Sequence, residues 1–260
     1  FTAALNDGVI ALDNEANIQY THLAEEVYDN PWQDRFQTRL DYTVAETLVN
    51  RMQTVANGGV LTAAIDPRLP VYANPTENSG EYVGMVYGIT QAEAGSISNS
   101  DVSFLGDALR QQDSPTYIYT AAQVAFARAE AALLGWTSDD AQEMYEMGIE
   151  LSIEQYLGED DAAVSAYLAD PWVAYNAGNA REQILTQKWI ANFLNGYEAW
   201  ADWRRTDFPA LDPAPAAQNA SGEIPVRQAY PTTERDLNGE NYDAVIARQG
   251  EDGLDQNIWW

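Results

Sequence analysis

The sequence predicts an all-α protein in which paired helices support a large irregular portion and few short strands. Three observations support this fold class. Apolar residues recur at helical spacing, capping residues precede several of these segments, and Pro and Gly crowd the stretches between them. The 260 residues can bury a sizeable core without disulfides or structural metals. No composition shift marks an internal boundary, so we expect residues 1–260 to form a single domain.

Composition excludes several classes of function. Forty Asp and Glu against thirteen Lys and Arg give a formal net charge of −27, which repels nucleic-acid phosphates and anionic lipids. The chain has no Cys, so a thiolate metal site and a Cys nucleophile are excluded. Its single His, His22, cannot form a multi-histidine metal site, and we assign it no role. We therefore expect no cofactor, no metal and no nucleic-acid partner.

Helical periodicity predicts five helices. Their predicted ranges are 42–56, 118–134, 138–157, 161–168 and 181–205. In the first of them Thr43 and Glu46 fit a capping box, in which the two side chains satisfy free backbone N–H groups, and Gly58-Gly59 follows its end. The sequence of residues 1–5 also predicts part of a helix.

Residues 115–157 form the clearest helix pair. Ser114 is expected to cap its first helix and Pro115 to stand at the first helical position, and this helix is apolar nearly all round. Ser138 is expected to cap the second helix, and Gly158 to end it. Two antiparallel helices joined by a short turn are the unit of tetratricopeptide-type repeats.

The longest predicted helix, 181–205, carries a stripe of aromatic residues three or four positions apart. The stripe consists of Trp189, Phe193, Tyr197 and Trp200. We expect these rings to lie in the core, because helical packing explains their spacing completely. After Pro209 the periodic pattern ends, and we expect residues 210–260 to be mostly irregular, with a short hairpin at most.

Residues 66–113 form a long irregular segment, punctuated by Pro and Gly and rich in Tyr and Asn. Long loops in compact proteins are commonly functional, so this segment is the candidate ligand-facing part of the chain. Enzyme motifs are scarce. Acidic pairs such as Asp139-Asp140 lie at predicted helix starts, where capping accounts for them. An acidic stretch at 236–240 lacks the glycine position of a calcium loop, and we interpret it as solvated.

Seven stretches, in order from residue 30 to the end of the chain, together carry a family signal. They are 30–32 (Asn-Pro-Trp), 41–52, 66–72 (Asp-Pro-Arg-Leu-Pro-Val-Tyr), 80–84 (Gly-Glu-Tyr-Val-Gly), 187–206, 224–241 and 259–260 (Trp-Trp). In this order and spacing they resemble SusD/RagB-type nutrient-binding outer-membrane lipoproteins, particularly the SusD-like subgroup.

The resemblance implies a binding protein and not an enzyme. Members of this family lie on the cell surface at the bacterial outer membrane, where they cover a SusC-like TonB-dependent transporter and capture oligosaccharides, or in some cases peptides, for import. It also implies that this chain lacks the family's N-terminal part, which includes the lipid-bearing Cys of the anchor. Two alternatives stay open: a peptide ligand on the same scaffold, and an all-helical carbohydrate-active hydrolase.

Candidate ligand-binding residues combine flat rings, amides and carboxylates, because sugars present apolar C–H faces edged with hydroxyls. Those in the irregular segment are Tyr72, Asn74, Asn78, Glu81, Tyr82, Tyr87 and Asn99, and Trp32 lies outside it. For each ring the alternative is that it packs the segment onto the helices. Arg68, Arg204, Arg205 and Arg227 are expected to pair with carboxylates.

Overall fold

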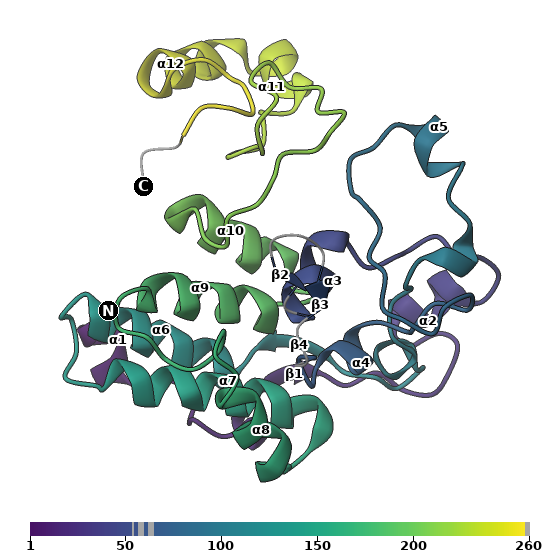
Figure 1. The fold of residues 1–260 in the computed structure, drawn as a ribbon. Coiled ribbons are helices and arrows are strands. Elements are labelled where there is room, and N and C mark those ends of the chain that lie inside the picture. Colours follow the sequence, from purple (N-terminus) through teal and green to yellow (C-terminus); the bar gives the residue numbers. More distant parts are fainter. Residues whose placement is uncertain (54, 57–59, 62–64, 258–260) are drawn as a thin grey trace. The chain divides into compact units, whose positions relative to one another are not determined.

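The computed structural model describes residues 1–53, 55–56, 60–61 and 65–257, so the Gly58-Gly59 and Trp259-Trp260 signals lie outside the described residues. It is mostly helical, as predicted (Figure 1). None of the helices in these ranges is long and apolar enough to cross a membrane.

The chain divides into two compact units, where the sequence predicted a single domain. Unit 1 comprises Phe1–Val86 and Ile97–Ala210, and unit 2 comprises Tyr87–Ser96 and Leu211–Trp260. The predicted irregular segment is therefore shared between the units. Unit 2 joins two stretches that lie more than a hundred residues apart in the sequence.

The helices of unit 1 are α1 (Thr2–Asp7), α2 (Pro31–Phe36), α3 (Glu46–Met52), α4 (Leu69–Tyr72), α6 (Ala121–Leu133), α7 (Ala141–Leu157), α8 (Asp161–Leu168), α9 (Ala180–Ala191) and α10 (Gly196–Thr206). Three 3-10 turns accompany them: η1 (Asn14–Ala16), η2 (Asn99–Asp101) and η3 (Asp107–Arg110). Two antiparallel pairs join the strands β1 (Ile18–Tyr20) with β4 (Thr116–Tyr119), and β2 (Val55–Ala56) with β3 (Val60–Leu61).

Helices α6 to α9 form one hydrophobic cluster, which we call the helical core (Figure 1). Helices α6 and α7 approach closely because α6 is rich in alanine and α7 has Gly148 at the contact. A Cβ on Gly148 would lie 2.7 Å from the Phe126 ring. The predicted ends of this pair are confirmed, since Gly135 and Gly158 have φ of 70° and 72° directly after the two helices.

Both helices of the pair start later than predicted, α6 by six residues at its cap and α7 by two. Ser114 and Pro115 do not begin α6, because Thr116–Tyr119, rich in β-branched and aromatic residues, pairs as a strand with β1. Thr120 caps α6 instead, in a capping box with Gln123. Likewise Asp140, and not Ser138, caps α7.

The first predicted helix is also shorter than predicted. It begins at Glu46 and its N-cap residue, Ala45, makes no side-chain capping bond, so the capping box is wrong. Thr43 instead forms a backbone bridge with Phe104, which removes it from the helix. Residues Val44, Leu48, Val49 and Met52 join a second core that also contains Leu69, Tyr72, Ala73, Leu105, Leu109 and Ile190.

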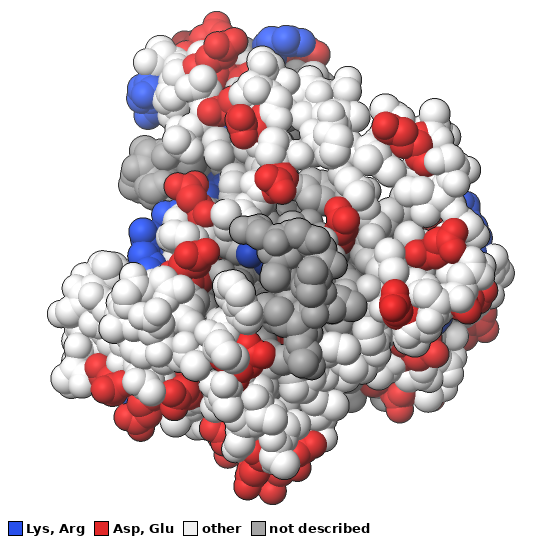
Figure 2. Space-filling model, viewed as in Figure 1, with Lys and Arg blue, Asp and Glu red and all other residues white. Residues whose placement is uncertain are grey.

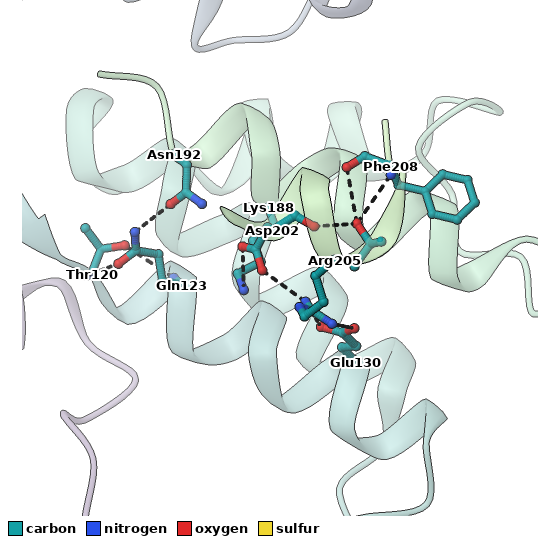
Figure 3. A network of polar contacts seen from close by, with 9 residues as sticks. Thr120, Gln123, Glu130, Lys188, Asn192, Asp202, Arg205 and Phe208 are labelled. Atoms are coloured by element: carbon teal, nitrogen blue, oxygen red, sulfur yellow. Dashed lines mark hydrogen bonds and ion pairs between the residues drawn. The ribbon is translucent and has the colours of Figure 1, made fainter. Parts of the chain in front are cut away.

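The longest predicted helix is two helices in the structure. Residues 192–195 separate α9 from α10, with Leu194 in the left-handed region at φ 67°. Lys188 of α9 then pairs with Asp202 of α10 over 2.8 Å (Figure 3). The break leaves Tyr197 77% exposed, so its prediction as a core residue is wrong. Trp189 and Phe193 are partly buried against the second core, as predicted.

Arg68, Arg205 and Arg227 form the predicted carboxylate pairs. These pairs are Arg68–Asp66, Arg205–Glu130 and Arg227–Asp252. Figure 3 shows Arg205 of α10 reaching Glu130 of α6, with N–O distances of 2.5 and 2.8 Å. The guanidinium carbon of Arg204 lies 4.4 Å from the centroid of the Trp200 ring, so this arginine stacks on an aromatic side chain.

Unit 2 contains α5 (Gln91–Ala94), α11 (Thr232–Leu237) and α12 (Gly239–Gln249). The C-terminal segment is therefore more regular than predicted. The sequence hides these helices because α11 is only six residues long, directly follows Pro231, and is separated from α12 by Asn238 alone. Neither helix contains a fully buried residue, so no strong apolar stripe marks them.

Candidate ligand-binding groove

Within unit 1 a groove of about 490 Å³ lies between α2 and η3. Its lining residues are Ala24, Gln33, Phe36, Gln37, Asp107, Arg110, Gln111, Gln112 and Asp113. Four of these are neutral amides, which both donate and accept hydrogen bonds. The groove therefore offers hydrogen-bonding groups of both kinds around a single aromatic ring.

The α2 wall of the groove is anchored by a buried cap. Asn30 is 1% exposed, and its Oδ1 accepts a hydrogen bond from the Trp32 backbone N–H over 2.8 Å. Its Nδ2 donates to the Ser114 carbonyl over 2.8 Å, which ties α2 to the chain before β4. On α2 and just beyond it, Gln37 Nε2 donates to Gln33 Oε1 over 2.7 Å, so the two groove amides are paired.

The η3 wall is held by the backbone around α4. The Gly106 N–H donates to the Tyr72 carbonyl over 3.0 Å. A Cβ on Gly106 would lie 1.9 Å from the Val71 carbonyl oxygen, so only glycine permits this close approach. The Asn74 side chain donates to Asp107 Oδ1 over 2.8 Å and accepts from the Asp107 N–H over 3.2 Å.

Three contacts fix Arg110, one of the residues that line the groove. Its guanidinium carbon lies 4.3 Å from the centroid of the Phe36 ring. Its Nε donates to the Leu105 carbonyl over 3.1 Å, and its Nη2 forms an ion pair with Asp107. The side chain is 21% exposed and is one of those that line the groove. A preorganised guanidinium of this kind donates hydrogen bonds at little entropic cost.

Further aromatic side chains adjoin α2. Phe36 meets Phe104 edge-on with ring centroids 6.4 Å apart, and Trp32 meets Tyr42 edge-on at 5.4 Å. Arg35 Nη1 donates to the Tyr42 hydroxyl over 2.5 Å. Trp32 also lines a smaller recess of about 60 Å³, whose other aromatic residues are Tyr117, Tyr156 and Phe193.

Tyr72 is the predicted ligand-binding residue that the structure contradicts. Its side chain has no exposed surface and stacks on Phe193, with ring centroids 4.4 Å apart. Burial raises the pKa of its hydroxyl to about 12. The packing alternative therefore applies to this ring, because α4 follows a fully buried ion pair and its last residue points into the second core.

The other predicted residues are not brought together. Tyr82 is half-buried against the second core, and burial raises its pKa. Glu81 is exposed, and its carbonyl accepts a hydrogen bond from Thr76 N–H over 2.8 Å. Tyr87 belongs to unit 2, where its hydroxyl donates to the Asp212 carbonyl. Asn78 bonds Asp101 over 2.6 Å, and Asn99 lies in η2.

Two predicted residues do contribute to the groove region. Trp32 shares α2 with the groove residues, and Asn74 positions the groove residue Asp107. The sequence reasoning missed Phe36, Arg110 and the four glutamines. The adjacent Gln111-Gln112 and the four-residue spacing of Gln33 and Gln37 are the signals that could have indicated them.

The surface is predominantly acidic, and unit 2 contains a further small recess. On the face shown in Figure 2, Asp and Glu are spread widely and Lys and Arg are few. No cluster of His, Cys, Asp or Glu suited to a metal ion occurs among the described residues. Within unit 2 a recess of about 70 Å³ is lined by Tyr230, Glu234, Asn238, Asn241, Tyr242 and Val245.

The fold is that of an α-helical protein whose helix pairs support a loop-built groove lined by amides and a ring. The chain belongs to the SusD-like family, because the family model described as starch-binding associating with outer membrane matches residues 1–231. The resemblance found in the sequence is thus confirmed. No curated protein matches the chain significantly.

Solved structures agree with this assignment. The chain is similar to a chitin-binding protein, with 27% identity and a TM-score of 0.81 over 99% of this chain and 58% of the other. A chitin-binding SusD homolog from Flavobacterium johnsoniae gives 26% identity and a TM-score of 0.79, with coverage of 99% and 56%. A SusD homolog from Bacteroides uniformis gives 28% identity and a TM-score of 0.79, over 97% of this chain and 57% of the homolog. The chain thus spans under two thirds of the length of these relatives.

Proposed function

We propose that this protein binds a glycan in the groove between α2 and η3 and leaves its bonds intact. The observation that carries the proposal is the Arg110–Phe36 stack, with ring and guanidinium 4.3 Å apart, set among four glutamine amides. The family description as starch-binding and the names of two similar structures as chitin-binding support a carbohydrate ligand.

The chemistry of the groove suits hydroxyl-rich and acetamido-bearing ligands. Amide groups such as Gln111 and Gln112 match neutral donors and acceptors on a sugar, and Arg110 adds a fixed donor. The Phe36 ring and the neighbouring aromatic cluster offer apolar surface for sugar C–H faces. Asp107 offsets the Arg110 charge by pairing with it, so the groove has no surplus of positive charge for an acidic ligand.

The proposal is tested by removing groove amides. The double variant Gln111→Ala, Gln112→Ala is compared with Gln142→Ala, an exposed glutamine on α7 that bonds Glu146 over 2.7 Å, far along the chain from the groove. Retention on gels containing starch, and calorimetry with chitin oligosaccharides, measure binding. We expect the groove variant to bind at least ~5-fold more weakly, since each lost hydrogen bond contributes about 1 kcal/mol, and the control to bind normally. Equal binding by both variants would contradict the proposal.

We propose the remaining properties from the family resemblance. They are exposure on the cell surface, lipid anchoring through an N-terminal segment outside these residues, and delivery of the ligand to a SusC-like TonB-dependent transporter for import. Co-purification of such a transporter with the protein from outer membranes is the direct test. New reducing ends on an incubated glycan would identify a hydrolase instead, and binding confined to the peptides of a mixed glycan and peptide array would identify a peptide ligand.

A further inference from the structure

The irregular segment begins at a fully buried ion pair between Asp66 and Arg68. Neither side chain has any exposed surface. Arg68 Nε donates to Asp66 Oδ1 over 2.9 Å and Nη2 donates to Oδ2 over 2.5 Å, so the pair is bidentate. Removing two charges from water is costly, and such a pair persists only where neighbouring groups satisfy its remaining hydrogen-bonding atoms.

Three helices of the helical core supply those neighbouring groups. Ser152 of α7 accepts from Arg68 Nη1 over 2.9 Å, and Gln187 of α9 accepts from Nη2 over 2.7 Å. Tyr167 of α8 donates its hydroxyl to Asp66 Oδ2 over 2.7 Å and accepts from Gln187 Nε2 over 3.0 Å. Burial and the Asp66 charge raise the pKa of Tyr167, so its hydroxyl keeps the proton that it donates.

The backbone segment that supports the η3 wall of the groove begins at this ion pair. Helix α4 starts at the residue after Arg68. The last residue of α4, Tyr72, accepts the Gly106 N–H through its carbonyl over 3.0 Å. Two residues later, Asn74 holds Asp107 through two hydrogen bonds. The path from the helical core through α4 to η3 therefore consists of hydrogen bonds, an ion pair and the covalent backbone.

We infer that Asp66, Arg68 and Tyr167 are positioning residues for the groove. Through α4 they fix the position of η3, and therefore of Arg110, relative to the helical core. None of the three lines the groove, so they act only through α4 and its contacts. The inference rests on the proposed function for what the groove binds, but the mechanical link that it describes is measurable without ligand.

Two matched tyrosine variants of the full chain test the link. Tyr167→Phe removes the hydroxyl that bonds Asp66. Tyr145→Phe removes a hydroxyl that is also buried and donates over the same distance, 2.7 Å, to the Val173 carbonyl, a contact outside the path to α4. Hydrogen exchange of the backbone amides in residues 104–112 is measured without ligand. We expect at least about tenfold faster exchange there for Tyr167→Phe, because Asp66 loses a donor and Gln187 loses an acceptor. For Tyr145→Phe we expect less than twofold change.

Glycan affinity of the same variants is the second measurement, with several-fold weaker binding expected for Tyr167→Phe alone. If Tyr167→Phe does not fold, Ser152→Ala replaces it with the same expected result. Equal exchange in residues 104–112 for both variants would overturn the inference. Faster exchange in Tyr167→Phe, in a protein whose unsubstituted form binds no glycan, would support the positioning role and overturn the proposed function.

Discussion

The helical core and the groove region of unit 1 are stabilised by different interactions. In the helical core, apolar side chains such as Phe126 and Ile149 are fully buried between α6 and α7. In the groove region, α2 and η3 depend on a buried asparagine cap, a glycine contact and stacked or paired polar groups. One region therefore draws its stability from buried apolar area, and the other from directional contacts between segments distant in the sequence.

This difference separates stability from function. Apolar packing is non-directional and tolerates change in surface residues, so helix pairs can serve as a constant support. Directional contacts place individual groups such as Arg110 with little freedom, which is what a preorganised binding groove requires. Substitutions in the two regions should accordingly differ in whether they lower global stability or groove order.

Breaking the Asp66–Arg68 pair should have the largest effect. In Arg68→Ala the Asp66 carboxylate stays buried without its cation, and we expect the free energy of unfolding to fall by ~3–5 kcal/mol. Urea unfolding followed by circular dichroism measures this. Arg39→Ala is the control, because Arg39 and its partner Asp41 are 74% and 43% exposed and the loss should be close to zero. A loss for Arg68→Ala no larger than that of the control would show that the pair is not a central contact.

Crowding the α6–α7 contact should affect stability and leave the groove unchanged. In Gly148→Ala the new Cβ meets the Phe126 ring at 2.7 Å, and we expect a loss of ~1–3 kcal/mol from overpacking. Gly196→Ala is the control, since no atom lies within 4 Å of its added Cβ. Thermal unfolding and glycan binding are measured together. Weaker glycan binding by folded Gly148→Ala would contradict the separation of the two regions.

Removing the Asn74 side chain should show the opposite pattern. Asn74→Ala deletes both hydrogen bonds to Asp107, and we expect a loss of only ~1 kcal/mol in unfolding free energy, because the site is partly exposed. Glycan affinity should nevertheless fall several-fold, because η3 carries Arg110. Calorimetric titration with a chitin oligosaccharide measures this, and Asn78→Ala, which breaks a bond to Asp101 outside the groove, is the matched control.

The smallest predicted effect is a pH dependence in the helical core. Arg128 donates to both carboxylate oxygens of Asp139 and lowers the pKa of that carboxyl. A carboxyl whose pKa is lowered by folding adds stability above its unfolded pKa of about 3.9, and this contribution is lost as the pH falls through the lower folded value. Asp139→Asn should therefore cost under ~1 kcal/mol at pH 7, and the cost should be smaller at pH 2. An equal cost at both pH values would exclude an ionic origin.

Much of the helical core could be predicted from the sequence, because its signals are local. The helix Asp161–Leu168 has the predicted bounds, and Gly135 and Gly158 end their helices as expected. Local signals failed where a distant segment competed for the same residues. Thr43 lies opposite Phe104 in a β-bridge in place of capping a helix. The turn at Leu194 interrupts a spacing that would suit one continuous helix.

The groove residues could not be found in the same way. Each glutamine pair, Gln33 with Gln37 and Gln111 with Gln112, is visible locally, but no period in the sequence joins one pair to the other. Ring and amide composition indicated Trp32 and Asn74, which adjoin the groove, and equally Tyr72, which is buried. Composition describes what a side chain can bind, and only its neighbours decide whether a ligand can reach it.

The order of short motifs by itself determined the family of this protein and the presence of paired helices, since both depend on residues close together in the chain. The tertiary structure alone decided that α2 and η3 face each other, that Arg110 stacks on Phe36, and that a charged pair lies beneath the segment. These features join residues dozens of positions apart. The energies of these contacts depend on burial and on the distance between the partners, and both are defined only in the folded chain.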